Sequence, residues 1–393
     1  MSGTDTSVER EPFFASRWVA PPVGVEELDP AHLAAGFAAG AVACGLKPSG
    51  NTDAAMVVAQ SEHCDSALLL TPNAAAAAPV RLCRQSCDFR QIRASAVKAG
   101  NANAATGEQG MRDAVAIQAA AAEELGLDPS LVAIAATGKI GEALPMDNVL
   151  DGIRRASNVV GPYGGEAFAK AIMTTDAFPK HCSVRCDGVT LSAQAKGAGM
   201  IQPGFATMLC FVQTDGIVED ADAVLRSAVE ASFERITVDG QMSTNDMVLL
   251  QASGESGRPL PEGLLDAVLL QLALLIVGDG EGATRVGCAR VMEAASQEEA
   301  ERAARAIANS PLVKTALFGH DPNWGRIAQA AGMALVGEEL PELGLDHIDA
   351  SEFAADATEV EVHLRLGRGD HGAHVWFSDL GYEYVRINAE YTT

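Results

Sequence analysis

Two hydrophobic periods alternate along the chain, and this alternation constrains the fold more than any other feature. From Gly36 onward, short apolar runs typical of strands alternate with segments whose apolar residues recur every three or four positions, as on one face of a helix. No repeat with a period of roughly 20–50 residues is found. Strands and helices in this mixture, with an expected hairpin near the C-terminus, predict a layered α/β or α+β fold rather than a doubly wound sheet.

The clearest single helix is predicted to begin after Thr106 and to end at Gly126. Thr106 and Gln109 have the spacing of a capping box, and glycine is a natural helix stop at its C-terminal end. The apolar face of this helix is predicted to hold Met111, Val115, Ala122 and Leu125.

The C-terminal part contains a second helix pattern and a pair of strand patterns. Ser296 and Glu299 form a capping box. The buried face of the helix that follows is predicted to hold Ala300, Ala303, Ala304 and Ile307. Residues 360–366 alternate between apolar and polar side chains, and 367–370 is expected to turn this strand into a hairpin partner around 375–377. The C-terminal ~110 residues are expected to form a smaller domain.

Charge and composition argue against several classes of function. The 393 residues include 28 basic and 52 acidic side chains, and the net charge of −24 disfavours binding to nucleic acid or to an anionic membrane surface. Residues 1–24 fit neither a signal peptide nor a transit peptide, so we expect a cytoplasmic protein. The apolar stretch 264–277 is interrupted by Asp266 and Gln271 and predicts a buried helix. The eight cysteines predict free thiols, and no metal site is expected.

The bond between Ala206 and Thr207 carries the sharpest functional hypothesis. A threonine that follows a small residue and a glycine-rich segment is where a self-cleaving precursor would cut. Attack of the Thr207 hydroxyl on the preceding carbonyl turns the peptide bond into an ester, and hydrolysis of the ester frees an N-terminal threonine. Such a residue supplies both the nucleophile and the base. Its α-amine can act as the base because the pKa of an α-amine is about 7.7–8.0, so part of it is unprotonated at neutral pH. The alternative is that Thr207 merely begins a buried strand.

A threonine nucleophile needs hydrogen-bond donors for the oxyanion, and Thr137-Gly138 is the candidate. The pair ends an apolar run, 131–136, that predicts a buried strand, and glycine lets a backbone amide point into a cleft. A simple turn after a strand is the alternative. Lys196 is a candidate to hold a substrate carboxylate or to aid cleavage, with a solvated loop lysine as the alternative. Glu281 is a candidate to bind the ammonium of an amino acid, with a surface turn as the alternative.

Taken together, these segments resemble the ornithine acetyltransferase family, also called the glutamate N-acetyltransferase family of arginine biosynthesis. The resemblance runs over nearly the whole chain from about Gly36, and many ordered motifs make it specific. The longer motifs include Gly100-Asn-Ala-Asn-Ala-Ala-Thr-Gly107, Ala136-Thr-Gly-Lys-Ile-Gly141, Lys196-Gly-Ala-Gly-Met200, Ala206-Thr-Met-Leu209, Ser243-Thr-Asn-Asp246 and Asp279-Gly-Glu-Gly-Ala283. Further matching segments are 45–50, 172–176, 237–240, 309–315, 321–326 and 388–393.

The resemblance implies a self-processing enzyme. Cleavage before Thr207 would give an α chain of residues 1–206 and a β chain of residues 207–393. A Thr207 acyl-enzyme would then move acetyl from N2-acetyl-L-ornithine to L-glutamate by a ping-pong route, with no cofactor. The resemblance places the oxyanion hole at Thr137 and Gly138. It places substrate binding at Thr174, Lys196, Thr207, Glu281, Asn388 and Thr393.

The resemblance also implies a fold and an assembly. The expected fold is a four-layer α/β/β/α sandwich that resembles N-terminal-nucleophile hydrolases in form but is connected differently. We assign this sandwich to residues 1–284 and a smaller α/β C-terminal domain to 285–393. Family members assemble from two or more αβ units, so an α2β2 heterotetramer or a larger assembly is expected. Amino acids are the expected small-molecule substrates, and neither nucleic acid nor membrane is an expected partner.

Several positions near the reacting centre depart from the family pattern. They are Lys139, Ala177, Phe205, Gln241 and Met242. These departures leave the nucleophile in place but leave the acyl donor and acceptor open, including whether acetyl-CoA donates. One alternative is a related N-terminal-threonine amidohydrolase or acyltransferase that acts on a different N-acyl amino acid or amide. The other is an uncleaved, inactive paralogue with a binding role, which predicts an intact chain.

Overall fold

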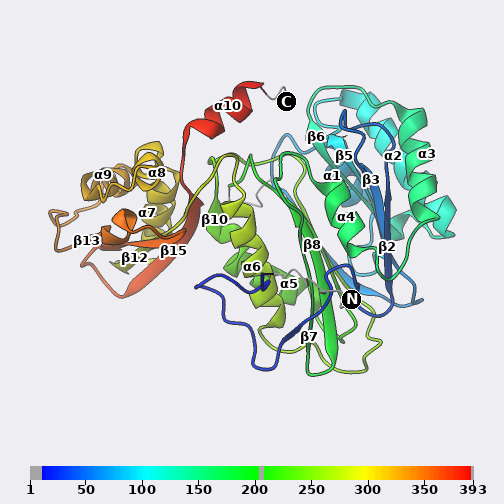
Figure 1. Cartoon of the computed structure of the whole chain (residues 1–393), viewed down its shortest axis with the longest axis horizontal. Coiled ribbons are helices and arrows are strands. Elements are labelled where there is room, and N and C mark those ends of the chain that lie inside the picture. Colours follow the sequence, from blue (N-terminus) through cyan, green and yellow to red (C-terminus); the bar gives the residue numbers. More distant parts are fainter. Residues whose placement is uncertain (1–10, 203–207, 391–393) are drawn as a thin grey trace, which may run out of the picture.

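The computed structural model describes residues 11–202 and 208–390, and within these ranges the strands form three sheets (Figure 1). The central sheet has the order β1-β7-β8-β9-β11-β4. The N-terminal sheet has the order β2-β3-β5-β6, and the C-terminal sheet has the order β10-β15-β12-β14-β13. The mixed α+β fold predicted from the sequence is therefore confirmed.

Each sheet draws strands from distant parts of the chain. The central sheet contains β1 (Glu26–Glu27), β7 (Lys180–Cys186), β8 (Val189–Lys196), β9 (Leu209–Thr214), β11 (Met247–Ala252) and β4 (Asp65–Leu70). The N-terminal sheet contains β2 (Phe37–Val42), β3 (Ala54–Ala59), β5 (Ala94–Asn101) and β6 (Val132–Lys139). The C-terminal sheet contains β10 (Ile236–Thr237), β15 (His371–Ser378), β12 (Val286–Ala294), β14 (Glu359–Arg365) and β13 (Ile348–Asp349).

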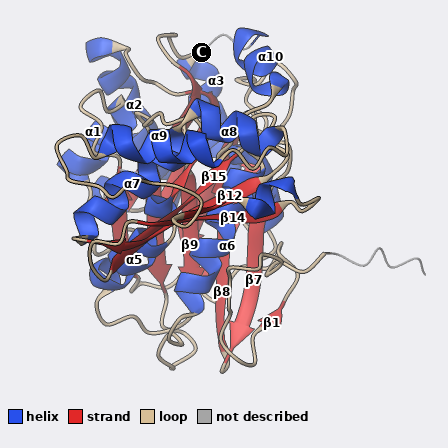
Figure 2. Ribbon diagram, turned by 90° about the vertical axis from the view of Figure 1, so that its left-hand side faces the viewer, coloured by secondary structure: helices blue, strands red, loops and turns tan. Residues whose placement is uncertain are grey.

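Helices pack on these sheets from several sides. Their bounds are α1 (Ala78–Ser86), α2 (Gly107–Leu125), α3 (Met146–Ser157), α4 (Gly165–Ile172), α5 (Ala221–Ala231), α6 (Leu264–Gly278), α7 (Gln297–Asn309), α8 (Pro311–Phe318), α9 (Trp324–Ala334) and α10 (Tyr382–Glu390). Helices α1, α2 and α3 contact the N-terminal sheet, α5 and α6 contact the central sheet, and α4 contacts strands of both. Figure 2 shows α7, α8 and α9 beside the C-terminal sheet.

Strand β9 is buried on both faces, and its side chains join two different cores. Leu209 and Phe211 belong to the apolar cluster shared with the N-terminal sheet. Cys210 and Val212 belong to the cluster shared with α5 and α6. Strands buried on both faces are apolar throughout rather than alternating, which explains the run Leu-Cys-Phe-Val.

Two of the predicted helices form as expected in their main features. The stretch predicted as a buried helix is α6, and most of its side chains are buried. In α7, the Ser296 hydroxyl accepts a hydrogen bond from the Glu299 amide at 3.1 Å. Its predicted apolar face is buried, namely Ala300, Ala303, Ala304 and Ile307. The Ser296 half of the predicted capping box and the amphipathic face of α7 are confirmed, whereas the Glu299 carboxylate accepts a hydrogen bond from the Ala295 amide rather than from that of Ser296.

The prediction for α2 was right in its bounds, wrong in its capping box and partly right in its apolar face. Thr106 precedes the helix, but its hydroxyl donates to Asn103 Oδ1 at 2.8 Å and makes no cap bond. Gln109 binds the Asp113 carboxylate instead of the helix start.

Three of the four residues predicted for the apolar face of α2 pack against the core. Ala122 is buried, and Met111 and Leu125 pack against the apolar cluster of the N-terminal sheet. Val115 is 47% exposed, and Ala114 and Ile117 are buried in its place. Small alanine side chains allow α2 to pack closely against its neighbours, so a pattern of large apolar residues marks only part of its buried face.

The predicted C-terminal hairpin was wrong. Strands β14 and β15 both form, but β12 lies between them, parallel to β14 and antiparallel to β15. The amides of Arg368 and Gly369 both donate to the Glu293 carbonyl, so the connecting loop passes over the end of β12. A loop with glycines can join two adjacent strands or cross over a third strand. Here β12 pairs with both β14 and β15, so the loop crosses over β12.

All eight cysteines are free thiols. Within the described ranges, no helix combines the length and hydropathy that a bilayer span requires. Strand β10 pairs with β15, so the C-terminal sheet includes two residues that lie well before position 285.

Candidate active site

A polar cavity of about 200 Å³ brings together residues from separate segments of the chain. It is lined by Thr137, Gly138, Thr174, Thr175, Lys196, Gly199, Met200, Asp239, Gln241, Glu281, Tyr384 and Asn388. All of the predicted site residues that lie within the described ranges therefore line one cavity. Ala206, Thr207 and Thr393 lie outside the described residues.

The end of β6 is shaped by an irregularity in its pairing with β5. Asn101 lies opposite both Thr137 and Lys139, which is the pattern of a bulge that redirects the backbone. Gly138 has φ +123°, and a Cβ there would lie 2.3 Å from the carbonyl carbon of Gly100. Only glycine fits this position, so the peptide groups on either side of it can face the cavity.

A buried charge network supports Lys196 at the end of β8. Lys196 Nζ lies 3.8 Å from Asp176 Oδ2, and both side chains are almost fully buried. Asp176 also binds Lys180 Nζ at 2.8 Å and the Gly197 amide at 2.7 Å. Lys180 in turn contacts Asp279, so two cations and two carboxylates share one interior site.

The protonation of this network follows from burial and charge. Burial opposes ionisation of Asp176, but Lys196 and Lys180 outweigh it and hold the pKa of Asp176 well below its ordinary value. Burial lowers the pKa of Lys196, while Asp176 opposes this shift. Burial raises the pKa of Asp279, with Lys180 acting against it. The network is thus a buried set of carboxylates and lysines that holds Lys196 at the cavity wall.

Glu281 and Asn388 form another part of the cavity wall. Asn388 Nδ2 donates to Glu281 Oε2 at 2.7 Å, which links α10 to the turn after α6. The Glu281 amide donates to the Ala198 carbonyl at 3.0 Å. A Cβ on Gly199 would lie 2.5 Å from the Glu281 carboxylate, so the glycine leaves room for this side chain. A carboxylate and an ammonium group therefore face one small space.

The sequence profile of the ArgJ family matches residues 38–393, which is most of the chain. The chain belongs to the ArgJ family. A relative from Thermus thermophilus, named arginine biosynthesis bifunctional protein ArgJ, is 44% identical over 92% of this chain and 99% of its own length. A relative of the same name from Symbiobacterium thermophilum is 42% identical over 91% of this chain and 97% of its own. A glutamate N-acetyltransferase from Methanosarcina mazei is 41% identical over 90% of this chain and 97% of its own length.

The positions that the sequence analysis named as departures from the family pattern lie in different parts of the structure. Gln241 lines the polar cavity. Lys139 forms an ion pair with Glu142 at 3.4 Å and lines a neighbouring cavity of about 960 Å³ that shares Thr174 with the first. The Ala177 amide donates to the Asp279 carboxylate, and Met242 offers its carbonyl to Asn73. Phe205 lies outside the described residues.

Asp239 and Tyr384 also line the polar cavity, although the sequence analysis gave neither of them a role. Asp239 lines the cavity and accepts hydrogen bonds from the amides of Met200 and Ile201, at 2.6 and 2.9 Å. Its motif, 237–240, was matched to the family without a role for the carboxylate. Tyr384 also lines the cavity, and its hydroxyl lies 3.5 Å from Asp239 Oδ2. No local pattern marks a tyrosine on an exposed helix as part of a distant site.

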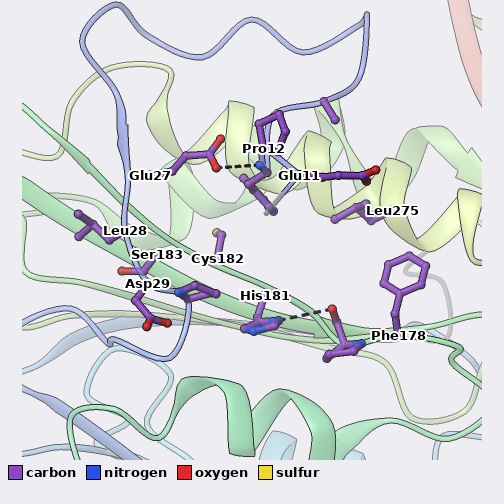
Figure 3. A pocket seen from close by; sticks show the side chains of 14 residues that line it. Glu11, Pro12, Glu27, Leu28, Asp29, Phe178, His181, Cys182, Ser183 and Leu275 are labelled. Carbon is purple, nitrogen blue, oxygen red and sulfur yellow. Dashed lines mark hydrogen bonds between the residues drawn. The ribbon is translucent and has the colours of Figure 1, made fainter. Parts of the chain in front are cut away.

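A third cavity, of about 490 Å³, lies near the start of β7 (Figure 3). Glu27 and Asp29 line it, together with the aromatic ring of Phe178. The Glu27 carboxylate accepts hydrogen bonds from the amides of Phe13 and Phe14, so it orders the segment around them. Of the predicted catalytic and substrate-binding residues that the structure describes, none lines this cavity.

Proposed function

We propose that this chain is a self-cleaving acetyltransferase of arginine biosynthesis that moves acetyl from N2-acetyl-L-ornithine to L-glutamate through Thr207. The observation that carries the proposal is the polar cavity, which unites Thr137, Gly138, Lys196 and Glu281 in an ArgJ-family chain. The named relatives are bifunctional arginine biosynthesis proteins and a glutamate N-acetyltransferase.

The proposed reaction has two half-reactions at one hydroxyl. The Thr207 α-amine takes the hydroxyl proton as the oxygen attacks the acetyl carbonyl, and the released amine of ornithine takes a proton as it leaves. The amine of glutamate then attacks the ester and frees Thr207. Thr137 and Gly138 donate hydrogen bonds to the oxyanion in both halves. No cofactor enters either half.

The cavity walls suit an amino acid that carries both charges. In the proposal, Lys196 binds the substrate carboxylate, and Glu281 binds an ammonium group, with Thr174 and Asn388 beside them. Thr207 and Thr393 complete the substrate-binding set by family resemblance. The small cavity volume, about 200 Å³, favours a single amino acid over a larger ligand.

We propose that cleavage leaves one folded unit. Strand β8 belongs to the α chain of residues 1–206, whereas β9 and β11 belong to the β chain from 207. Strand β9 pairs with β8 on one side and with β11 on the other, so backbone hydrogen bonds join the two products. Assembly as α2β2 or larger, and a cytoplasmic location, remain parts of this proposal.

We also propose a more specific architecture than the mixed α+β fold class. Central-sheet and N-terminal-sheet residues share one apolar cluster, and helices contact both sheets, which supports a four-layer α/β/β/α sandwich at 1–284. A separate apolar cluster between α7–α9 and the C-terminal sheet supports the smaller domain at 285–393. The resemblance to N-terminal-nucleophile hydrolases belongs to the same proposal.

Product analysis with and without glutamate tests the reaction. We expect purified protein to form N-acetylglutamate and ornithine from N-acetylornithine and glutamate, with little acetate released. Release of acetate at the same rate without glutamate would instead favour the amidohydrolase alternative. Absence of turnover together with an intact chain would favour the binding-protein alternative.

Replacing Thr137 by valine tests the proposed oxyanion hole. Valine has nearly the shape of threonine but lacks the donor, so we expect kcat per cleaved chain to fall by about 10²–10³-fold. Thr137→Ser keeps the hydroxyl and is the matched control, expected to retain most of the activity. Equal activity of the valine and serine variants would remove the hydroxyl from the mechanism.

Replacing Glu281 by glutamine tests the proposed ammonium site. The amide keeps the hydrogen-bonding shape but loses the charge, so we expect kcat/KM to fall by about 10–100-fold, mainly through KM. Glu383→Gln is the control, because this exposed carboxylate on α10 binds Arg386 and does not line the cavity. A loss of the same size in the control would point to α10 rather than to substrate binding.

A further inference from the structure

The polar cavity offers a single cation to a substrate that carries two carboxylates. Among the described residues that line it, Lys196 is the only basic side chain, whereas Asp239 and Glu281 are both acidic. Glutamate, the proposed acetyl acceptor, has an α-carboxylate and a side-chain carboxylate. A carboxylate that leaves water needs a cation or several hydrogen bonds to offset the loss. Whichever carboxylate Lys196 binds, the other one still needs a partner.

Three neutral hydrogen-bond donors of this cavity are already directed at its own acidic residues. Asn388 Nδ2 donates to Glu281 Oε2 at 2.7 Å. The Tyr384 hydroxyl lies 3.5 Å from Asp239 Oδ2, and Gln241 Nε2 donates to the Asp239 carbonyl at 3.4 Å. A second substrate carboxylate would take these donors away from their present acceptors. The partner for that carboxylate is therefore better sought next to the polar cavity than inside it.

The larger cavity of about 960 Å³ adjoins the polar cavity at two places. Thr174 lines both cavities. Gly138 lines the polar cavity, Gly100 lines the larger one, and the two glycines pair directly between β5 and β6. A ligand longer than the polar cavity can therefore extend into the larger one.

The larger cavity has an excess of positive charge. Its basic side chains are Lys47, Lys139 and Lys170. Its acidic side chains are Asp176 and Glu390. Asp176 is already balanced by Lys180 and Lys196 in the buried network. The cavity therefore suits the anionic end of a ligand.

The contacts of these three lysines single out Lys139. The Lys47 ammonium donates to three backbone carbonyls, which uses all its donors. The Lys170 ammonium contacts the Glu166 carboxylate at 2.6 Å. The Lys139 ammonium lies 3.4 Å from the Glu142 carboxylate, and the Glu142 side chain is 53% exposed. Such a loose, exposed pair contributes little, so Lys139 can exchange Glu142 for a substrate carboxylate at small cost.

The backbone of Lys139 is fixed where the two cavities meet. Lys139 directly follows Gly138 and ends β6. At the bulge, Asn101 pairs with both Thr137 and Lys139, and the Lys139 carbonyl accepts a hydrogen bond from the Ala102 amide at 2.8 Å. The lysine side chain therefore starts from a defined point on the cavity wall.

We propose that Lys139 binds the side-chain carboxylate of the acetyl acceptor, an inference that rests on the proposed function. The α-carboxylate of the acceptor lies on Lys196 in the polar cavity, and its side chain extends past Thr174 to Lys139. The side chain of ornithine ends in an ammonium group, which gains nothing from a lysine. Lys139 is thus a specificity residue of the second half-reaction, and it selects a dicarboxylic amino acid as the acceptor.

The test compares two acetyl transfers from the same donor, N-acetylornithine. One acceptor is glutamate, and the other is isotope-labelled ornithine, whose exchange into N-acetylornithine needs no acidic side chain. For Lys139→Met we expect kcat/KM for glutamate to fall by about 10–100-fold, mainly through KM, and the exchange rate to stay within about twofold of wild type. Glutamine has the shape of glutamate without the side-chain charge, so its slower transfer should be the same in wild type and Lys139→Met.

Two further variants separate the role of this charge from a structural one. Lys139→Arg keeps the positive charge and should recover most of the preference for glutamate over glutamine. Lys170→Met removes a cation from the same cavity, but that ammonium is held by Glu166, so both transfers should keep their wild-type rates.

Several results would overturn the proposal. They are an unchanged kcat/KM for glutamate in Lys139→Met, a parallel loss of glutamate transfer and ornithine exchange in that variant, and an equal loss of glutamate transfer in Lys170→Met. A Lys139→Met chain that fails to fold loses both transfers in parallel and counts among them. A wild type that exchanges no labelled ornithine would instead overturn the proposed function.

Discussion

Replacing Thr207 by alanine is expected to leave one uncut chain with the precursor mass of 40.8 kDa. Alanine has no hydroxyl to attack the preceding carbonyl, so neither the ester nor the free α-amine forms. Acetyl transfer should fall by at least about 10⁴-fold, because nucleophile and base are lost together. Intact mass spectrometry and a transfer assay with N-acetylornithine and glutamate measure the two effects.

Thr207→Ser is the matched control for this prediction. Serine retains the hydroxyl, so we expect two fragments, residues 1–206 and 207–393, and measurable transfer. A Thr207→Ala chain that still divides between residues 206 and 207 would show that another agent makes the cut. If the wild-type chain stays uncut, Thr207 has no free α-amine to act as the base, and the alternative of an inactive binding protein becomes the better explanation.

Replacing Lys180 by methionine is expected to destabilise the folded chain by about 3–5 kcal/mol. Methionine fills a similar volume, but it leaves Asp176 and Asp279 as buried carboxylates without the cation that both contact. Lys196 remains near Asp176 only, at 3.8 Å. Urea unfolding in the uncut Thr207→Ala background measures the change on a single chain.

Lys170→Met is the control for the buried network. Lys170 and Glu166 form an ion pair with the same four-residue spacing as Lys180 and Asp176, but both side chains are substantially exposed. Surface pairs contribute about 0–1 kcal/mol, so this variant should unfold at almost the wild-type urea concentration. Equal effects of the two substitutions would mean that Lys180 is not needed to balance the buried acids.

Local patterns in the sequence predicted individual elements well where large apolar residues or caps define them. The capping residue Ser296, the alanine face of α7 and the buried helix α6 could all be predicted, because each depends on residues close together in the chain. The buried face of α2 was predicted only in part, because alanines dominate it and Val115, unlike Met111, Ala122 and Leu125, points outward.

Pairing between distant segments could not be predicted in the same way. Residues 367–370 have the composition of a hairpin turn, yet β12 separates the two strands they connect. Asp176 and Asp279 lie in motifs that were recognised in the sequence, but no local pattern indicated that Lys180 binds both carboxylates. Such contacts depend on which buried donors and acceptors meet after the sheets assemble.

The sequence by itself supplied the residues on which the proposed chemistry depends, namely a threonine after a small residue at position 207 and a Thr-Gly pair after a buried strand, and the motifs that mark the ArgJ family. The tertiary structure alone decided that Lys196, Glu281 and Asn388 face one cavity, and that Asp246 lies beside Met208. The physical reason is the distance along the chain over which each kind of interaction acts. Periodicity and capping act over a few residues, whereas burial and strand pairing join segments far apart in the chain, by 38 residues for Met208 and Asp246 and by 107 for Glu281 and Asn388.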